Sequence, residues 1–246
     1  MFDVIYDSPW HHPVLCWAAT PLVLGLLWRA RPRPGAAREA QLLWRLALFG
    51  QLLIALDALF TGSWSPLAAG TAASTGAGIL FVILGDLRYF VLLERYSPGA
   101  PPSGPGGLGR SARGFLRALG LSLLVPILFA GVSQVLPAVF AEPRRKFLGY
   151  ELLFLGLLLV VRLALLPRRL TQGGPDAAAV RRWLLRLTAF EAVQYVLWAL
   201  ADVVILAGER AGLLLRLLPN ILYYLAFVPL SYLTAPPCLR GQRRAR

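Results

Sequence analysis

Seven apolar stretches, each about as long as a membrane-spanning helix, restrict what this chain can fold into. They lie near residues 12–28, 41–60, 72–93, 118–140, 147–166, 183–207 and 212–234. A spanning helix needs about 20 predominantly apolar residues. The hydrophobic share of 57% also exceeds that of ordinary soluble domains. Because seven spans use most of the 246 residues, the sequence predicts a single all-α transmembrane bundle without a soluble domain.

The positions of the basic residues predict the orientation of this bundle. The loops after the first, third and fifth spans, and the segment after the last span, each carry four arginines. By the positive-inside rule the N-terminus lies outside, and the C-terminus with its basic tail 236–246 is cytoplasmic. The cluster Arg144–Lys146 is the exception, which we interpret as an interfacial anchor or a contact with anionic lipid. The net charge of +13 therefore indicates insertion and contact with anionic headgroups at the cytoplasmic face, and not nucleic-acid binding.

Composition and the remaining segments favour a multi-pass protein of a bacterial inner membrane. Arginine replaces lysine nearly everywhere, which is typical of a GC-rich bacterial genome, and the single Lys146 lies in a loop, which excludes a retinal protein. Segment 97–109, SPGAPPSGPGGLG, is predicted to be a flexible cytoplasmic linker. Residues 1–12 are acidic and lack a basic n-region, so we expect no cleaved signal peptide.

Short motifs in the first three spans recur in the last three. Asp57 corresponds to Asp202, and the segment Asp86–Phe90 corresponds to Asn220–Tyr224. Because one further span separates the two halves, they would share one orientation, giving a 3+1+3 plan with parallel repeats, as in some transporters. Chance similarity among helices rich in leucine and alanine is the alternative interpretation.

Carboxylates inside the spans are the strongest functional signal. Ionisable groups at the bilayer centre cost at least about 2.5–3.5 kcal/mol each, and they persist where they face protein or a water-filled cavity. The acids at membrane depth are Asp57, Asp86, Glu151, Glu191 and Asp202.

Arginines are less informative than these acids, because their long stems can reach the headgroups from positions near the cytoplasmic ends of the spans. Those expected to do so are Arg45, Arg88, Arg162 and Arg186.

Two polar stripes predict that the last two spans face each other or a shared cavity. On span 183–207 the helical period places Glu191, Tyr195, Trp198 and Asp202 on one face, with Gln194 beside them.

Span 212–234 carries a similar stripe, formed by Arg216, Asn220 and Tyr224, with Tyr223 beside it. We expect Arg216 to pair with Asp202 or with Asp57. The alternative to a cavity is an interhelical hydrogen-bond network that only stabilises the bundle.

The leading interpretation is a polar intramembrane cavity that binds or transports a small molecule or a lipid-like ligand, with coupling to protons. Asp202 or Glu191 would carry the proton, tyrosine and tryptophan rings would form the walls, and Gln194 and Asn220 would orient the ligand. No catalytic motif is present, and the adjacent His11 and His12 point about 100° apart. We therefore predict no metal site and no cofactor.

Two alternatives stay open. The segments Ala199–Asp202 and Leu222–Ala226 resemble the late aspartate and Tyr-Tyr motifs of the YhhN-type lysoplasmalogenases, and Asp57 would be the early aspartate. The resemblance implies an intramembrane lipid hydrolase in which Asp57 and Asp202 share a water. The chain departs from that family because the early Lys-Pro motif is missing and Asp86 stands where a histidine is expected. The second alternative is a non-catalytic membrane subunit or scaffold.

Overall fold

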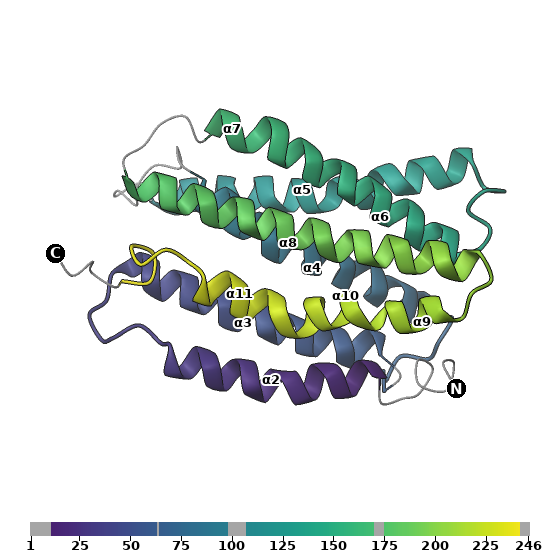
Figure 1. The fold of residues 1–246 in the computed structure, drawn as a ribbon, viewed down its shortest axis with the longest axis horizontal. Coiled ribbons are helices and arrows are strands. Elements are labelled where there is room, and N and C mark those ends of the chain that lie inside the picture. The colour runs from purple at the N-terminus through teal and green to yellow at the C-terminus, as the bar shows by residue number, and fades with distance from the viewer. Residues whose placement is uncertain (1–10, 63, 98–106, 170–174, 242–246) are drawn as a thin grey trace.

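The structure is a computed structural model that describes residues 11–62, 64–97, 107–169 and 175–241. Within these residues every regular element is a helix, and the helices run side by side along one axis (Figure 1). The first elements are α2 (His11–Arg29), α3 (Arg38–Thr61), α4 (Ala72–Tyr96) and α5 (Gly107–Val135). They are followed by α6 (Pro143–Val160), the π-helical turn η1 (Val161–Leu165), α7 (Leu166–Arg169) and α8 (Pro175–Leu206).

Six of these helical segments are long and apolar enough to cross a membrane. They are Arg38–Thr61, Ala72–Tyr96, Ala112–Val135, Pro143–Arg168, Asp176–Leu206 and Ala211–Leu233. The apolar part of α2, Leu15–Arg29, is shorter than these six. The all-helical, multi-pass architecture is thus confirmed, whereas the seventh span, the orientation and the internal repeat stay predictions.

Prolines explain several helix ends. Helix α5 ends at Val135, five residues before the predicted boundary, because Pro137 disfavours helical geometry in the residue before it. Pro143 begins α6 and Pro175 begins α8. Proline is tolerated at the first position of a helix, because the N–H there has no partner within the helix.

Residues 107–109, predicted as linker, form the first turn of α5, and 98–106 lie outside the described residues. In the basic tail, residues 236–241 contain a turn and 242–246 lie outside the described residues.

The last span, Ala211–Leu233, is interrupted rather than continuous, and we call it the last rod. It consists of α9 (Ala211–Leu215), α10 (Leu217–Ile221), the π-helical turn η2 (Leu222–Ala226) and α11 (Phe227–Leu233). Pro219 and Pro229 lie in this rod and cannot donate the helical hydrogen bond. Such interruptions and π-helical turns concentrate at functional positions of helices.

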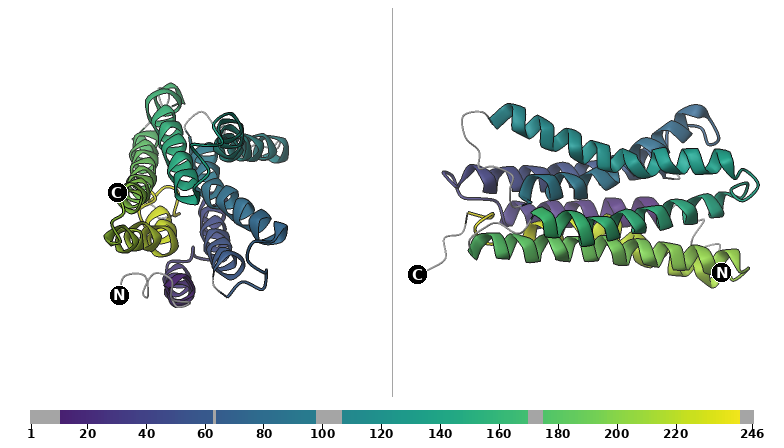
Figure 2. Two further views of the ribbon diagram at one scale, coloured as in Figure 1. Left: turned by 90° about the vertical axis from the view of Figure 1, so that its right-hand side faces the viewer. Right: turned by 90° about the horizontal axis from the view of Figure 1, so that it is seen from above.

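Helix α4 is the centre of the bundle. Half of its apolar window is buried inside the protein, compared with 17% for α5, which lies at the edge. The end-on view in Figure 2 shows the helices gathered into one bundle, with α2 at its margin. An aromatic contact joins α4 to α6, because the Phe90 ring lies 5.9 Å from Phe154. Most side chains from Gly85 to Tyr96 are buried, so this half of α4 faces protein on most sides.

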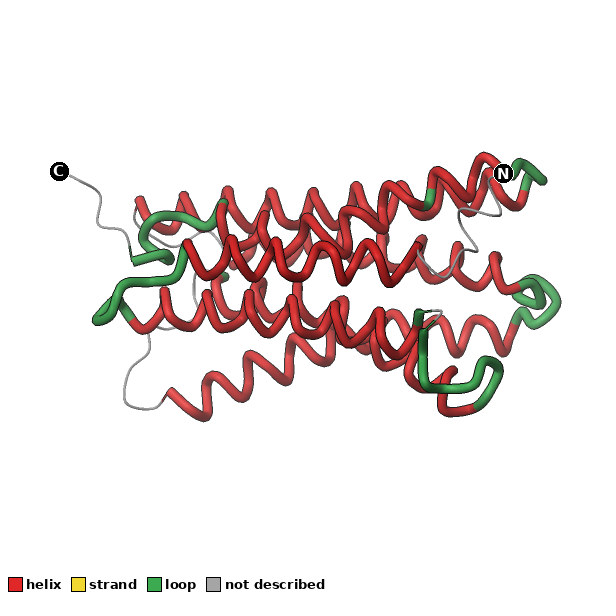
Figure 3. The backbone as a smooth tube through the Cα atoms, turned by 90° about the horizontal axis from the view of Figure 1, so that it is seen from below, coloured by secondary structure: helices red, strands yellow, loops and turns green. Residues whose placement is uncertain are grey.

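The connections gather at the two ends of the bundle (Figure 3). The α2–α3 loop and the described end of the chain lie together at one end, which we call the basic end (Figure 1). The α5–α6 and α8–α9 loops lie at the other end, which we call the opposite end. This alternation of the connections between the two ends agrees with the charges of the loops in the sequence. The side of the membrane on which each end lies stays a prediction.

The chain carries its own probe of this orientation. Cys238, at the basic end, is an exposed cysteine, whereas Cys16 is buried in α2. A membrane-impermeant maleimide is expected to label Cys238 in inside-out vesicles and to leave it unlabelled in intact cells, with Cys238→Ser as the control. Labelling in intact cells would reverse the predicted orientation.

Candidate functional site

The candidate residues from the sequence form two polar clusters inside the bundle. We call the first the outer cluster, because it lies toward the opposite end; it contains Arg144, Glu151, Trp198, Asp202, Arg216 and Asn220. We call the second the central cluster; it contains Asp57, Asp86, Arg88, Tyr150, Glu191, Tyr195 and Tyr223. Tyr150 and Glu151 are neighbours on α6, so this helix contributes to both.

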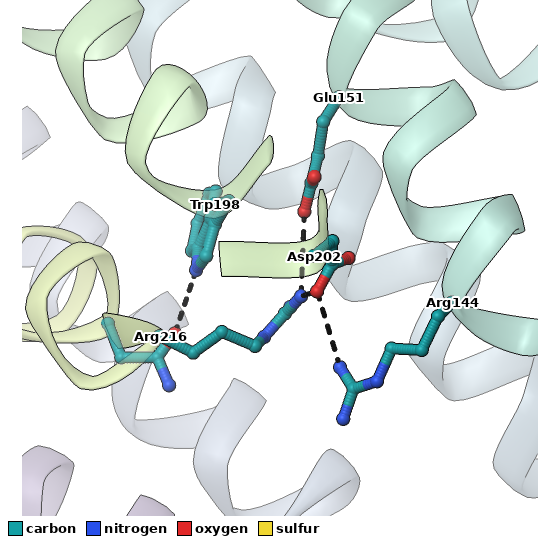
Figure 4. A network of polar contacts seen from close by, with 6 residues as sticks. Arg144, Glu151, Trp198, Asp202 and Arg216 are labelled. Carbon is teal, nitrogen blue, oxygen red and sulfur yellow. Dashed lines mark hydrogen bonds and ion pairs between the residues drawn. The ribbon is translucent and has the colours of Figure 1, made fainter. Parts of the chain in front are cut away.

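In the outer cluster, guanidinium groups alternate with carboxylates (Figure 4). Nη1 of Arg216 contacts Oδ1 of the fully buried Asp202 and lies 3.7 Å from Oε1 of Glu151. Nη1 of Arg144 lies 3.6 Å from the same Asp202 oxygen. Two basic and two acidic groups face each other, so the outer cluster is formally neutral. The Arg216–Asp202 pair is one of the two pairings that the sequence predicted.

These ion pairs also explain the exception to the positive-inside rule. Arg144 reaches Asp202, and the exposed Nε of Arg145 lies 3.4 Å from Oε2 of Glu142. Two of the three basic residues in that loop therefore have acidic partners within the chain. Arg144 thereby joins α6 to α8, whereas contact of this cluster with lipid headgroups stays a prediction.

An aromatic layer separates the two clusters and joins α8 to the last rod. Nε1 of Trp198 donates a hydrogen bond of 2.9 Å to Oδ1 of Asn220, which confirms that the last two spans face each other. The Trp198 ring lies 5.2 Å from Tyr195 and 5.7 Å from Tyr223. Tyr223 in turn lies 4.9 Å from the buried Tyr224. The rings that the sequence assigned to cavity walls thus pack against one another.

In the central cluster, tyrosine hydroxyls hold the aspartates. Asp86 of α4 accepts hydrogen bonds of 2.6 Å from both Tyr150 of α6 and Tyr195 of α8. Asp57 of α3 accepts a bond of 3.0 Å from Tyr223 of the last rod and one of 2.8 Å from Thr61. Each aspartate therefore joins helices that are far apart in the sequence.

Arg88 is the largest departure from the sequence-based expectation. Arg45, Arg162 and Arg186 are exposed, as expected for side chains that extend toward the headgroups.

Arg88, by contrast, is 8% exposed. Its Nε donates to the Gly85 carbonyl at 3.0 Å, and its guanidinium carbon lies 4.5 Å from the Tyr223 ring and 4.8 Å from the Phe227 ring. Its Nη1 is buried and has no hydrogen-bond partner within the part of the chain that the structure describes. Because α4 is central and two rings one turn apart on the last rod receive the guanidinium, Arg88 points inward.

Glu191 completes a charge imbalance around Arg88. Its side chain is 4% exposed and makes no hydrogen bond with any other described residue. The Arg88 charge acts on Glu191, on Asp57 and on Asp86. Three buried acids thus lie within electrostatic range of one guanidinium. Within the described residues no group of three or more histidine, cysteine, aspartate or glutamate side chains is placed to hold a metal ion.

A pocket of about 110 Å³ lies beside Arg88. Its lining, apolar except for Arg88 and Ser231, consists of residues from α3, α4 and α11 together with Phe115 of α5. Phe49 and Phe115 are about half exposed, so they lie on the outer surface of the bundle. In a membrane this pocket opens toward lipid, between α3 and α5.

Three residues of the two clusters are missing from the sequence-based candidates. Tyr150 carries a hydrogen bond to Asp86, Arg144 pairs with Asp202, and Arg88 organises the central cluster. The i, i+4 spacing of Tyr223 and Phe227 is the one signal that pointed to a buried cation. Of the other candidates, Gln194 is buried, and its Oε1 has no partner among the described residues.

The chain was compared with protein-family models, with curated proteins and with solved structures, and it matches none of them. The likeness to lysoplasmalogenases therefore rests on the short motifs alone. In the structure the two aspartates of those motifs have separate partners: Asp57 is held by Tyr223 and Thr61, and Asp202 by Arg216 and Arg144. Function has to be inferred from this geometry.

A glycine on α4 provides a stability test of the central cluster. A Cβ on Gly85 would lie 2.5 Å from the Tyr223 hydroxyl, whereas a Cβ on Gly78 of the same helix meets nothing within 4 Å. Gly85→Ala is expected to displace Tyr223 from Asp57 and to lower the free energy of unfolding by about 1–3 kcal/mol. Gly78→Ala should unfold at the wild-type temperature. Equal melting temperatures for the two variants would contradict this packing.

The outer cluster gives a second stability prediction. Asp202→Asn removes the carboxylate that faces two guanidinium groups, and removing one partner of a buried ion pair typically costs about 3–5 kcal/mol. Glu142→Gln, which affects only an exposed pair, should leave the thermal unfolding temperature unchanged. If both variants unfold like the wild type, the outer cluster does not stabilise the bundle.

Proposed function

We propose that this multi-pass membrane protein binds a lipid-like ligand in the pocket beside Arg88 and translocates it with coupling to protons carried by the central cluster. Asp57, Asp86 and Glu191 are the proton-carrying groups, and Arg88 is the group that senses both protons and ligand. We expect the membrane to be a bacterial inner membrane, with the basic end in the cytoplasm.

The difference in charge between the two clusters carries this proposal. Two acids and two guanidinium groups balance in the outer cluster. In the central cluster three acids face the single Arg88, which would leave a net charge of −2 if every carboxyl were ionised. An uncompensated charge in a low-dielectric interior is costly. Protons are the simplest cations that can reduce it, and their number can change when a ligand approaches Arg88.

The interrupted last rod supports movement around this site. Transporters form their binding sites from discontinuous helices at membrane depth. Here the regular α-helical pattern changes at Arg216, where the backbone stays helical, and the π-helical turn η2 contains Tyr223, which contacts both Asp57 and Arg88. A change in the geometry of η2 would therefore alter a hydrogen bond and a cation–π contact together.

The two alternative functions have less support. A hydrolase in which Asp57 and Asp202 share a water needs the two carboxylates to meet, whereas they belong to different clusters. A purely structural role suits the balanced outer cluster, but it leaves Glu191, buried without a hydrogen bond, without a purpose. We therefore assign a stabilising role to the outer cluster and the ligand-linked role to the central one.

Infrared spectroscopy of the protein reconstituted in lipid tests the proton-carrying role. We expect the absorption of protonated carboxyl groups at neutral pH, because three acids share one guanidinium. Glu191→Gln should remove part of this absorption, since Glu191 has no hydroxyl donor to stabilise its anion.

Glu142→Gln is the matched control, because Glu142 is exposed and pairs with Arg145 at the surface. A wild-type spectrum without protonated carboxyl absorption, or one that Glu191→Gln leaves unchanged, would remove proton coupling from the proposal.

A further inference from the structure

We propose that the ligand of the Arg88 pocket is a long-chain fatty acid, whose carboxylate pairs with Arg88 and whose acyl chain extends between Phe49 and Phe115 into the bilayer. This inference rests on the proposed function, since it names the ligand class of the same site. Three features of the pocket favour this ligand: the charge at its inner wall, its size and the side on which it opens.

Arg88 lines the inner wall of the pocket, and its guanidinium has a buried N–H group that no described residue accepts. Arg88 Nη1 is buried and unpartnered among the described residues, and the side chain is 8% exposed. Arginine holds carboxylates through two parallel hydrogen bonds, and such charge-assisted bonds are among the strongest in proteins. The rings of Tyr223 and Phe227 fix the plane of the guanidinium, so it is already oriented before a ligand arrives.

The size of the pocket selects a small head group. Its volume is about 110 Å³. A cavity of about 150 Å³ holds benzene, and one water molecule occupies about 30 Å³ in the liquid. A carboxylate with its first methylenes fits this space. The residues that line it are otherwise apolar, including Leu43, Leu46, Leu53, Leu87 and Val91.

The rim of the pocket lies on the outer surface of the bundle. Phe49 of α3 is 54% exposed and Phe115, between Arg113 and Arg117 near the start of the apolar part of α5, is 50% exposed. Helix α5 is also the least buried of the six long spans. An acyl chain can therefore follow this surface while its head group enters beside α4.

Charge links fatty-acid binding to the protons of the central cluster. The titratable groups that face Arg88 are Asp57 from α3, Asp86 from α4, Glu191 from α8 and Tyr223 from the last rod; α5 contributes the apolar Phe115. Every proton that an acid of this set takes up leaves Arg88 with one anion fewer to neutralise. Proton uptake and carboxylate binding should therefore support each other.

Binding of tritiated palmitate to the full-length protein in lipid nanodiscs tests the inference, with empty nanodiscs as the background. We expect saturable binding that unlabelled palmitate displaces. Methyl palmitate, which lacks the anion, and hexadecyltrimethylammonium, which carries the opposite charge, should each displace it at least about tenfold less well. Arg88→Gln should weaken binding at least about tenfold, while Arg45→Gln, an exposed arginine of α3, should bind like the wild type.

A second variant tests the pocket without changing its charge. A Cβ on Gly50 would lie 3.5 Å from Val228 and 3.7 Å from the Arg88 stem, which is ordinary contact, and the methyl groups of Gly50→Val extend further into the pocket that Gly50 lines. We expect at least about tenfold weaker palmitate binding by the folded variant, which the added methyl groups destabilise by about 1–3 kcal/mol. Gly120→Val on α5, where a Cβ meets nothing within 4 Å, is the matched control and should bind like the wild type.

Three results would overturn the inference: no saturable binding by the folded wild-type protein, equal displacement by methyl palmitate, or wild-type affinity in both Arg88→Gln and Gly50→Val. If any of these occurs while the carboxyl absorption that depends on Glu191 is present, the fatty acid is the wrong ligand and the proton-linked site stands. If that absorption is also absent, the proposed function falls with it.

Discussion

The burial of the Arg88 guanidinium among carboxylates is the interaction on which the organisation of this bundle depends. A charge in hydrocarbon has no water to solvate it, so its partners must come from the protein. The partners of Arg88 come from four elements of the bundle. A carbonyl of its own helix α4 accepts its hydrogen bond, two aromatic rings of the last rod lie against its guanidinium, and acids on α3, α4 and α8 act on it electrostatically. The helices must therefore pack around α4 in this order for the charge to be tolerated.

The two polar clusters meet the same constraint in different ways. In the outer cluster Asp202, Glu151, Arg144 and Arg216 neutralise one another, so the cluster joins three helices and has no charge left to exchange. In the central cluster the acids outnumber the cation, so the state of lowest energy depends on protons or on a ligand. The aromatic layer around Trp198 separates the two, because its packed rings leave the clusters different partners.

Much of the architecture could be predicted from the sequence, because membrane insertion leaves a strong one-dimensional record. Apolar length identified the spans, and the helical period placed Asp202, Trp198 and Asn220 on facing stripes, which their contacts confirm. Residues whose role depends on packing were less accessible. Arg88 lies near enough to a helix end to reach the headgroups, and only the inward face of α4 determines that it does not. Nothing in the sequence distinguishes Tyr150 from the other aromatic residues, and only the fold places it beside Asp86.

The sequence by itself determined the solvent, the helical class and the acidic residues that need an explanation, because each follows from composition and from the period of one helix. The tertiary structure alone decided how charges are shared: that Arg144 serves Asp202, that Arg88 faces three acids, and that a small pocket opens beside it toward the bilayer. The physical reason is that charge balance is a property of side chains from several helices, and the sequence of one helix does not state which neighbour it meets.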